Sequence, residues 1–161
     1  EVIRSAIKKF RPGRHRIETV HSADSINWVD DSKATNPHAA TASLLSHESV
    51  IWIAGGLAKG AAMEELVERT AKRIKAAILI GTDRGLIESA LIKFCPQVPR
   101  VLIDADSSEE LMTKAVSAAK GFAQAGDTVL LAPACASMDQ FISYADRGDC
   151  FAAAVKKVVN K

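Results

Sequence analysis

The residues best suited to chemistry in this sequence form one polar run, Asp31-Ser32-Lys33-Ala34-Thr35-Asn36. An apolar segment, 26–29, precedes it, and Pro37 with an alanine-rich stretch follows, so the pattern predicts a strand end, a short loop and a helix start. Asn36 suits the N-cap, and proline suits the first helical position. Such loops bind ligands in open α/β sheets. On spacing alone, a binding loop and a well-capped helix with solvated neighbours carry equal weight.

Two further polar loops are expected at the same edge of the sheet. The first, Gly55 to Gly60, combines glycines that permit tight turns and close approach of a ligand with the cation Lys59. It suits a carboxylate or a phosphate, and an ordinary loop with a solvated lysine is an equally good interpretation. The second runs from Pro133 to Phe141. There Ser137 favours an anion receptor or a helix cap over a nucleophile, because no GxSxG motif surrounds it.

Several other chemistries lack their motifs. The sequence contains neither GxxxxGK[ST] nor GxGxxG, and it contains no HExxH, cysteine cluster or EF-hand loop, so no metal site is predicted. The histidines show no triad order. Cys135 has no adjacent base and is interpreted as a packed thiol. Asp139 and the pair Asp146-Arg147 are interpreted as cap or surface ion-pair residues.

Length and composition predict one domain with an aliphatic core. The chain has 161 residues, of which 48% are apolar and 5% aromatic. A net charge of +2 is too balanced to indicate a nucleic-acid or membrane surface. The 3 cysteines form no CxxC pair, which fits a reducing, cytoplasmic compartment. No apolar run approaches the length of a membrane span, and no signal peptide is visible. Because the chain begins at Glu1, we expect a piece of something longer.

The elements that must position these loops follow from hydrophobic periodicity. Residues 1–10 are expected to form a short helix or linker, with a solvated basic cluster of Lys8, Lys9, Arg11, Arg14 and Arg16. Strands are expected at 15–20 and 25–30 as a hairpin, then at 50–54, 77–81, 101–103 and 128–132. Helices are expected at 63–73, 86–94, 107–125 and 149–159, with Gly126 closing the third. This order predicts a Rossmann-like three-layer α/β sandwich over residues 1–161, mostly parallel, with an antiparallel N-terminal hairpin at its edge.

With these loops in place, the chain resembles the C-terminal domain of the Mur ligases, and within that family the members that add D-glutamate. The resemblance is carried, in family order, by His15-Arg16-Ile17-Glu18, Trp28, DSKATN at 31–36, Ala54-Gly55-Gly56 with Lys59-Gly60, PACASMDQF at 133–141 and Arg147-Gly148-Asp149. It implies an ATP-dependent ligase of peptidoglycan precursor synthesis. In that reaction ATP phosphorylates the carboxylate of UDP-N-acetylmuramoyl-L-alanine, and the amine of D-glutamate attacks the acyl phosphate.

The resemblance also implies a division of labour. The UDP-binding domain and the central ATPase domain, which holds the P-loop and most Mg²⁺ ligands, would be absent from this chain, which would be inactive alone. The amino-acid pocket is assigned to Thr35, Lys59, Ser137, Met138 and Tyr144, with Lys59 on one carboxylate of D-glutamate and Ser137 with the Met138 backbone on the other. The side that reaches ATP when this domain closes on the central domain is assigned to Arg16, Asp31, Lys33 and Asn36.

Two positions depart from the family pattern. Leu57-Ala58 stands where many members are more polar, and Tyr144 stands where phenylalanine is expected, so its ligand contact would be by backbone only. Two alternatives stay open. One is a stand-alone, non-catalytic α/β ligand-binding module. The other is a sister Mur ligase or a folylpolyglutamate synthetase relative that adds a different amino acid.

Overall fold

Apolar strands separated by helices form a single sheet in the computed structural model, which describes residues 12–160. Within these residues the strands are β1 (Glu18–Ala23), β2 (Ile26–Asp30), β3 (Val50–Gly55), β4 (Ile74–Ile80), β5 (Arg100–Leu102) and β6 (Thr128–Leu131). Their order across the described sheet of 6 strands is β1-β2-β6-β3-β4-β5. Only the β1–β2 pair among them is antiparallel. The predicted mostly parallel sheet with a hairpin at its edge is therefore confirmed.

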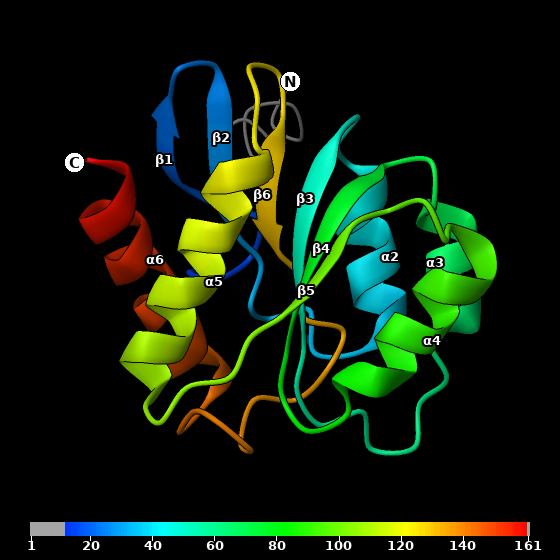
Figure 1. The fold of residues 1–161 in the computed structure, drawn as a ribbon. Coiled ribbons are helices and arrows are strands. Elements are labelled where there is room, and N and C mark those ends of the chain that lie inside the picture. Colours follow the sequence, from blue (N-terminus) through cyan, green and yellow to red (C-terminus); the bar gives the residue numbers. More distant parts are fainter. Residues whose placement is uncertain (1–11, 161) are drawn as a thin grey trace, which may run out of the picture.

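Helices cover both faces of this sheet (Figure 1). In the described part of the chain they are α2 (Pro37–Leu45), α3 (Glu64–Thr70), α4 (Arg84–Phe94), α5 (Ser108–Phe122) and α6 (Tyr144–Val159). Figure 1 shows α5 and α6 on one face and α2, α3 and α4 on the other. None of the described helices is both long and apolar enough to cross a membrane. The result is the three-layer sandwich that the periodicity predicts.

The sheet separates two hydrophobic cores. Trp52 and Leu44 belong to the core under α2, α3 and α4, whereas Trp28 and Phe151 belong to the core under α5 and α6. Every residue of β3 is buried. A central parallel strand covered on both faces needs apolar side chains in both directions. This is why Val50–Gly55 is a continuous apolar run.

Several predicted boundaries were wrong. The first strand begins at Glu18, because His15 and Ile17 have left-handed φ angles of 63° and 47° that no strand contains. The strand expected at 77–81 begins earlier, at Ile74, which directly follows the expected helix 63–73. Gly126 does not close α5, which ends at Phe122; its C-cap is Ala123, whose backbone amide donates a hydrogen bond to the Ala119 carbonyl. The predictions for residues 1–10 and for Arg11 lie outside the described residues.

The last helix begins earlier than its apolar pattern indicates. It starts at Tyr144 rather than near residue 149, and the Ser143 hydroxyl caps it by accepting from the amide of Asp146. The first turns contain Asp146, Arg147 and Gly148. This polar run with a glycine lacks the apolar spacing that predicts an amphipathic helix. The earlier start places Tyr144 at the edge of the sheet where the parallel strands end.

Candidate functional site

The loops that follow β2, β3, β4 and β6 gather at one edge of the sheet, the lower edge in Figure 1. The loop after β2 is short and fixed by its own backbone. The Asp31 amide donates to the Leu131 carbonyl at 2.8 Å and so extends the β2–β6 ladder. The Ser32 amide donates to the Asp30 carboxylate at 2.9 Å. Asn36 then caps α2, as predicted, by accepting from the Ala39 amide at 2.9 Å.

The loop after β3 is held by two neighbouring loops. Leu57 and Ala136 exchange backbone hydrogen bonds of 2.9 Å in both directions. The carboxylate of Asp83, which follows β4, accepts from the Ala58 amide at 2.8 Å. Lys59 comes next and has a left-handed φ of 51°. Asp83 belongs to no recognisable motif, so no pattern in the sequence connects it with the loop of Lys59.

Two glycines of this loop, Gly55 and Gly56, pack closely against the backbone of neighbouring segments. A Cβ at Gly55 would overlap the Ile80 carbonyl oxygen, and one at Gly56 would overlap the Ala136 carbonyl oxygen. Their φ angles of 121° and 136° are also open mainly to glycine. At these two positions the missing Cβ leaves room for protein backbone, and the expected approach of a ligand stays a prediction. The two glycines allow three loops of the protein to pack against one another.

Residues predicted for one pocket come together. A hollow of about 260 Å³ is lined by Thr35, Lys59, Ala136, Ser137, Met138, Ser143 and Tyr144. All the residues that the resemblance assigns to the amino-acid pocket are in this set. They come from the loops after β2, β3 and β6 and from the start of α6, so they converge only because the strands are parallel. We call this hollow the Lys59–Ser137 pocket.

Polar groups in this pocket are free to bind a ligand. Within residues 12–160, the Lys59 ammonium makes no ion pair, and the hydroxyls of Thr35 and Ser137 make no hydrogen bond. Ser137 is only 4% exposed, and it lines the pocket. A hydroxyl at a pocket wall can donate a hydrogen bond to a ligand and accept one from it. The pocket therefore offers an ammonium and two unpaired hydroxyls.

Of the two interpretations of Ser137, the helix cap is wrong, and the anion receptor stays a prediction. A turn follows this residue, in which the Ser137 carbonyl accepts from the amides of Gln140 and Phe141 at 3.1 and 2.9 Å. The helix that does begin at the pocket is α6, whose cap Ser143 and first residue Tyr144 both line it. The helix amides at this wall therefore come from the start of α6 and not from the residues after Ser137.

Arg16, Asp31 and Lys33 line a separate hollow of about 240 Å³, together with Ile17, Ala34 and Ala39. Asp31 is buried, and its carboxylate accepts from the Ile17 amide at 3.3 Å. Lys33 lies between the two hollows, because its Nζ is 4.1 Å from the centre of the Tyr144 ring. This is cation–π distance. The two groups of residues assigned from the resemblance thus form adjacent but distinct hollows.

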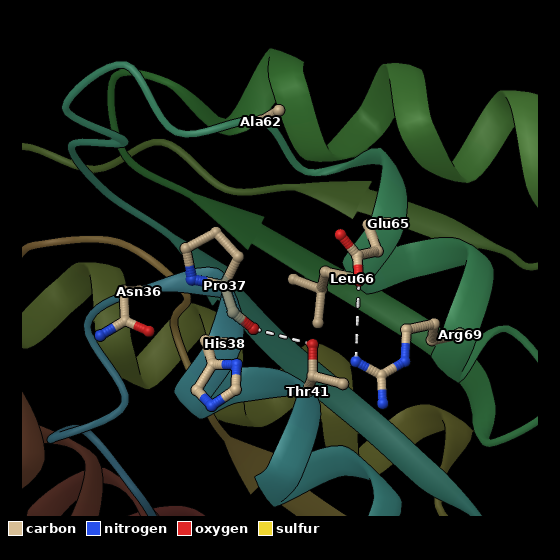
Figure 2. A pocket seen from close by; sticks show the side chains of 8 residues that line it. All are labelled: Asn36, Pro37, His38, Thr41, Ala62, Glu65, Leu66 and Arg69. Atoms are coloured by element: carbon tan, nitrogen blue, oxygen red, sulfur yellow. Dashed lines mark hydrogen bonds and ion pairs between the residues drawn. The ribbon is translucent and has the colours of Figure 1, made fainter.

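Asn36 lies in neither hollow. Its side chain faces a cleft of about 350 Å³ between α2 and α3, with Thr41 and Arg69 (Figure 2). Its Oδ1 is already engaged in capping α2. Figure 2 also shows the Glu65–Arg69 ion pair along α3, at 3.8 Å. The structure therefore separates Asn36 from Arg16, Asp31 and Lys33.

A buried histidine packs beneath the polar loop. His15 Nδ1 and Asp30 Oδ2 are 2.6 Å apart, and both residues are almost fully buried. Burial raises the pKa of Asp30 from its usual value, against the lowering effect of the bond to His15. Glu18 lies close enough for the three to form a potential metal set. Its carboxylate accepts from the His15 amide, and the other Asp30 oxygen accepts from Ser32, so internal bonds already use this donor set.

Asp139 and Arg147, interpreted from the sequence as cap or surface ion-pair residues, have other roles in the structure. Asp139 accepts from the Thr82 amide at 2.8 Å and so ties the loop after β6 to the loop after β4. Arg147 is not a surface residue: it is fully buried, and its guanidinium bonds Ser32 and the Cys135 carbonyl. Asp146 does act at the helix start, where its carboxylate accepts from the Ile142 amide at 3.0 Å. Cys135 is a packed thiol, as predicted, and burial raises its pKa to about 12.

Comparison with known families decides the assignment. The family model for the Mur ligase, glutamate ligase domain, matches residues 15–135. The chain belongs to the Mur ligase family. This Mur ligase domain is 52% identical over 157 residues to a UDP-N-acetylmuramoylalanine–D-glutamate ligase of Streptomyces coelicolor, a match that covers 97% of the chain and 33% of the relative. A ligase of the same name from Bifidobacterium longum subsp. infantis is 55% identical over 157 residues, covering 94% and 33%.

Solved structures show the same fold. The UDP-N-acetylmuramate-alanine ligase of Thermotoga maritima superposes with a TM-score of 0.60 at 12% identity, covering 95% of this domain and 32% of that chain. A bifunctional folylpolyglutamate synthase/dihydrofolate synthase of Yersinia pestis gives a TM-score of 0.54 at 15% identity, covering 92% and 32%. This Mur ligase domain spans about a third of the length of the curated relatives that it matches.

Proposed function

We propose that this chain is the C-terminal, amino-acid-delivering domain of an ATP-dependent ligase. The ligase adds D-glutamate to UDP-N-acetylmuramoyl-L-alanine in cytoplasmic peptidoglycan precursor synthesis, and the isolated domain is inactive. The observation that carries the proposal is the Lys59–Ser137 pocket. It combines the Lys59 ammonium with the hydroxyls of Thr35 and Ser137, none of which has a partner among residues 12–160, and with the start of α6. Relatives about 50% identical are named for D-glutamate addition.

The chemistry of the pocket suits a dicarboxylate. Lys59 supplies a charge-assisted hydrogen bond to one carboxylate, and such bonds are stronger than neutral ones. Ser137 and the first amides of α6 suit the second, because the N-terminus of a helix attracts anions. Holding both carboxylates leaves the amine of D-glutamate as its one unengaged polar group. The pocket therefore presents a nucleophile and shields the groups that must not react.

The residues of the second hollow fit the phosphates of ATP. Arg16 and Lys33 supply cations, and the carboxylate of Asp31 suits contact with Mg²⁺. When bound mainly by the central domain, Mg·ATP supplies the phosphoryl group that activates the acceptor carboxylate. Lys33 also lies 4.1 Å from the centre of the Tyr144 ring, so one residue adjoins both hollows. We assign Arg16, Asp31 and Lys33 to the nucleotide side and leave Asn36 with the capping role that its contacts support.

The proposal is tested by Lys59→Ala in the complete ligase. Loss of a hydrogen bond to a charged group costs about 1.5–3 kcal/mol, or roughly ten- to hundredfold in the KM for D-glutamate. The KM for ATP should stay within about twofold of the wild-type value, since Lys59 is not in the second hollow. Steady-state kinetics with each substrate varied in turn measures both constants.

Lys72→Ala is the matched control, because Lys72 is exposed and lies before β4 at the opposite edge of the sheet. It should leave both KM values unchanged. An unchanged requirement for D-glutamate in Lys59→Ala would sink the pocket assignment. Faster turnover with another amino acid than with D-glutamate in the wild-type enzyme would instead support a sister ligase.

A further inference from the structure

Arg147 is the least expected side chain near the Lys59–Ser137 pocket. It is fully buried, yet no carboxylate of the described residues forms an ion pair with it. Its guanidinium donates instead from Nε to the Ser32 hydroxyl at 2.9 Å, from Nη2 to the Ser32 carbonyl at 2.9 Å and from Nη1 to the Cys135 carbonyl at 3.0 Å. Burial lowers its pKa to about 10, so it stays charged at neutral pH.

Burying a charge without a partner charge is costly, so a specific benefit should accompany it. The guanidinium donates hydrogen bonds to three neutral acceptors, which belong to two loops, those after β2 and after β6. A planar fork of donors fixes the distance and the angle between its acceptors. Arg147 therefore acts as a rigid spacer between Ser32 and Cys135.

Ser32 connects Arg147 to the start of α6, which forms a third wall of the pocket. Its hydroxyl accepts from Arg147 and donates to the Tyr144 carbonyl at 2.7 Å. Ser32 is three positions before Thr35, and Cys135 is two positions before Ser137. The bonds of one buried guanidinium and one buried hydroxyl thus connect the three segments that carry Thr35, Ser137 and Tyr144.

We propose that Arg147, acting through Ser32, is a positioning residue that sets the separation of the loops on either side of the amino-acid pocket. The inference rests on the proposed function of that pocket. It differs in that neither Arg147 nor Ser32 lines the pocket or touches the ligand. The second hollow is lined only by residues within 16–39, on one side of the link. A change in loop separation should therefore alter amino-acid binding more than nucleotide binding.

The test uses three variants of the complete ligase. Ser32→Ala removes the hydroxyl that joins Arg147 to Tyr144. Arg147→Lys keeps a cation but cannot reproduce the fork. Ser49→Ala is the matched control, since its hydroxyl also makes a cross-chain bond, to Asp127 at 2.7 Å, but at the opposite edge of the sheet. Melting temperature, kcat and the KM values for D-glutamate and ATP are measured for each.

Ser32→Ala should raise the KM for D-glutamate about fivefold, the value of one lost hydrogen bond, with kcat and the KM for ATP within twofold. Ser49→Ala should lower the melting temperature comparably and leave every KM unchanged. If both residues act as one link, adding Arg147→Lys to Ser32→Ala should raise the KM by less than the product of the single effects. Ser32→Ala keeps the test decisive if Arg147→Lys does not fold.

The inference is overturned if Ser32→Ala behaves like Ser49→Ala, with lower stability and an unchanged KM for D-glutamate. It is also overturned if the KM values for ATP and D-glutamate rise in parallel. Failure of the proposed function looks different, because the wild-type enzyme would then not use D-glutamate. Ser32→Ala and Ser49→Ala are then compared on the KM for the amino acid that the wild-type enzyme does use. An unchanged KM for that amino acid in Ser32→Ala would overturn the positioning role.

Discussion

Cys135 and Ser137, two positions apart in one loop, differ sharply in chemical availability. Both residues are buried, but Ser137 lines the pocket and its hydroxyl has no partner in the described part of the chain, whereas the thiol of Cys135 lies in the hydrophobic core under α2. Burial raises the pKa of Cys135 to about 12, and only the thiolate is a good nucleophile. Proximity to the pocket therefore does not make Cys135 a reactive group.

We expect iodoacetamide at pH 8 to label Cys150 before the other cysteines of the native protein. Cys150 is half-buried, while Cys95 and Cys135 are fully buried with raised pKa values. Burial also raises the pKa of Cys150, so its labelling should be slower than in the unfolded chain. Peptide mass mapping against time measures the order, and labelling of Cys135 as fast as in urea would contradict it.

Two helical glycines illustrate how packing can reverse a local preference at the scale of an element. Gly148 lies in α6 and Gly121 in α5. A Cβ at Gly148 would overlap His15 Nδ1 and come within 2.6 Å of Asp30 Oδ2, whereas one at Gly121 would meet nothing within 4 Å. Helix propensity favours alanine at both positions. The buried His15–Asp30 pair therefore requires glycine at one of them only.

Alanine should have opposite effects at these two positions. Gly121→Ala should stabilise the protein by up to about 1 kcal/mol, because it gains helix propensity. Gly148→Ala should destabilise it by roughly 1–3 kcal/mol, because the overlap with a packed ring and carboxylate outweighs that gain. Urea denaturation of both variants measures the free energies of unfolding. Two changes of the same sign would show that α6 can move away from His15.

The two edges of the sheet differ across the molecule as a whole. One edge carries the candidate site, and at the opposite edge the side chain of Asp127 holds three segments together. This carboxylate accepts from Ser49 Oγ at 2.7 Å, from Lys75 Nζ at 2.6 Å and from the Gln124 amide at 2.8 Å. It thereby joins the segments that begin β3, β4 and β6. Burial acts to raise the pKa of Asp127, but these bonds outweigh it and the pKa is lowered below 3.8.

The lowered pKa of Asp127 predicts how stability depends on pH. The folded protein favours the charged carboxylate, so this stabilisation is present above the unfolded pKa near 3.9 and is lost as pH falls through the lower folded pKa. Asp127→Asn should cost about 1.5–3 kcal/mol at pH 7. The difference from the wild-type protein should be smaller at an acidic pH below the unfolded pKa near 3.9 than at pH 7. Urea denaturation at both pH values measures it, and a constant difference would contradict the assigned charge.

Most residues that line the candidate site could be predicted from the sequence. The hydrogen bonds that hold its loops together could not. The family resemblance places Thr35, Lys59 and Ser137 in one pocket, and the structure brings them together. The contacts that hold their loops were missed. Asp83 and Asp139 each accept from a backbone amide of another loop, and such bonds depend on backbone positions that carry no sequence signal.

The layers of this protein, its parallel sheet and the edge on which the polar loops meet follow from the amino-acid pattern. Apolar periodicity indicates which faces are buried, and the connection of strands through helices sets their direction. The burial of Arg147 follows from contacts that form only in the folded chain. Its acceptor Ser32 is 115 residues away, and no local pattern distinguishes a buried arginine from a solvated one. Folding alone brings Ser32 and Cys135 to the same guanidinium, where the pairing of donors with acceptors offsets the cost of burial.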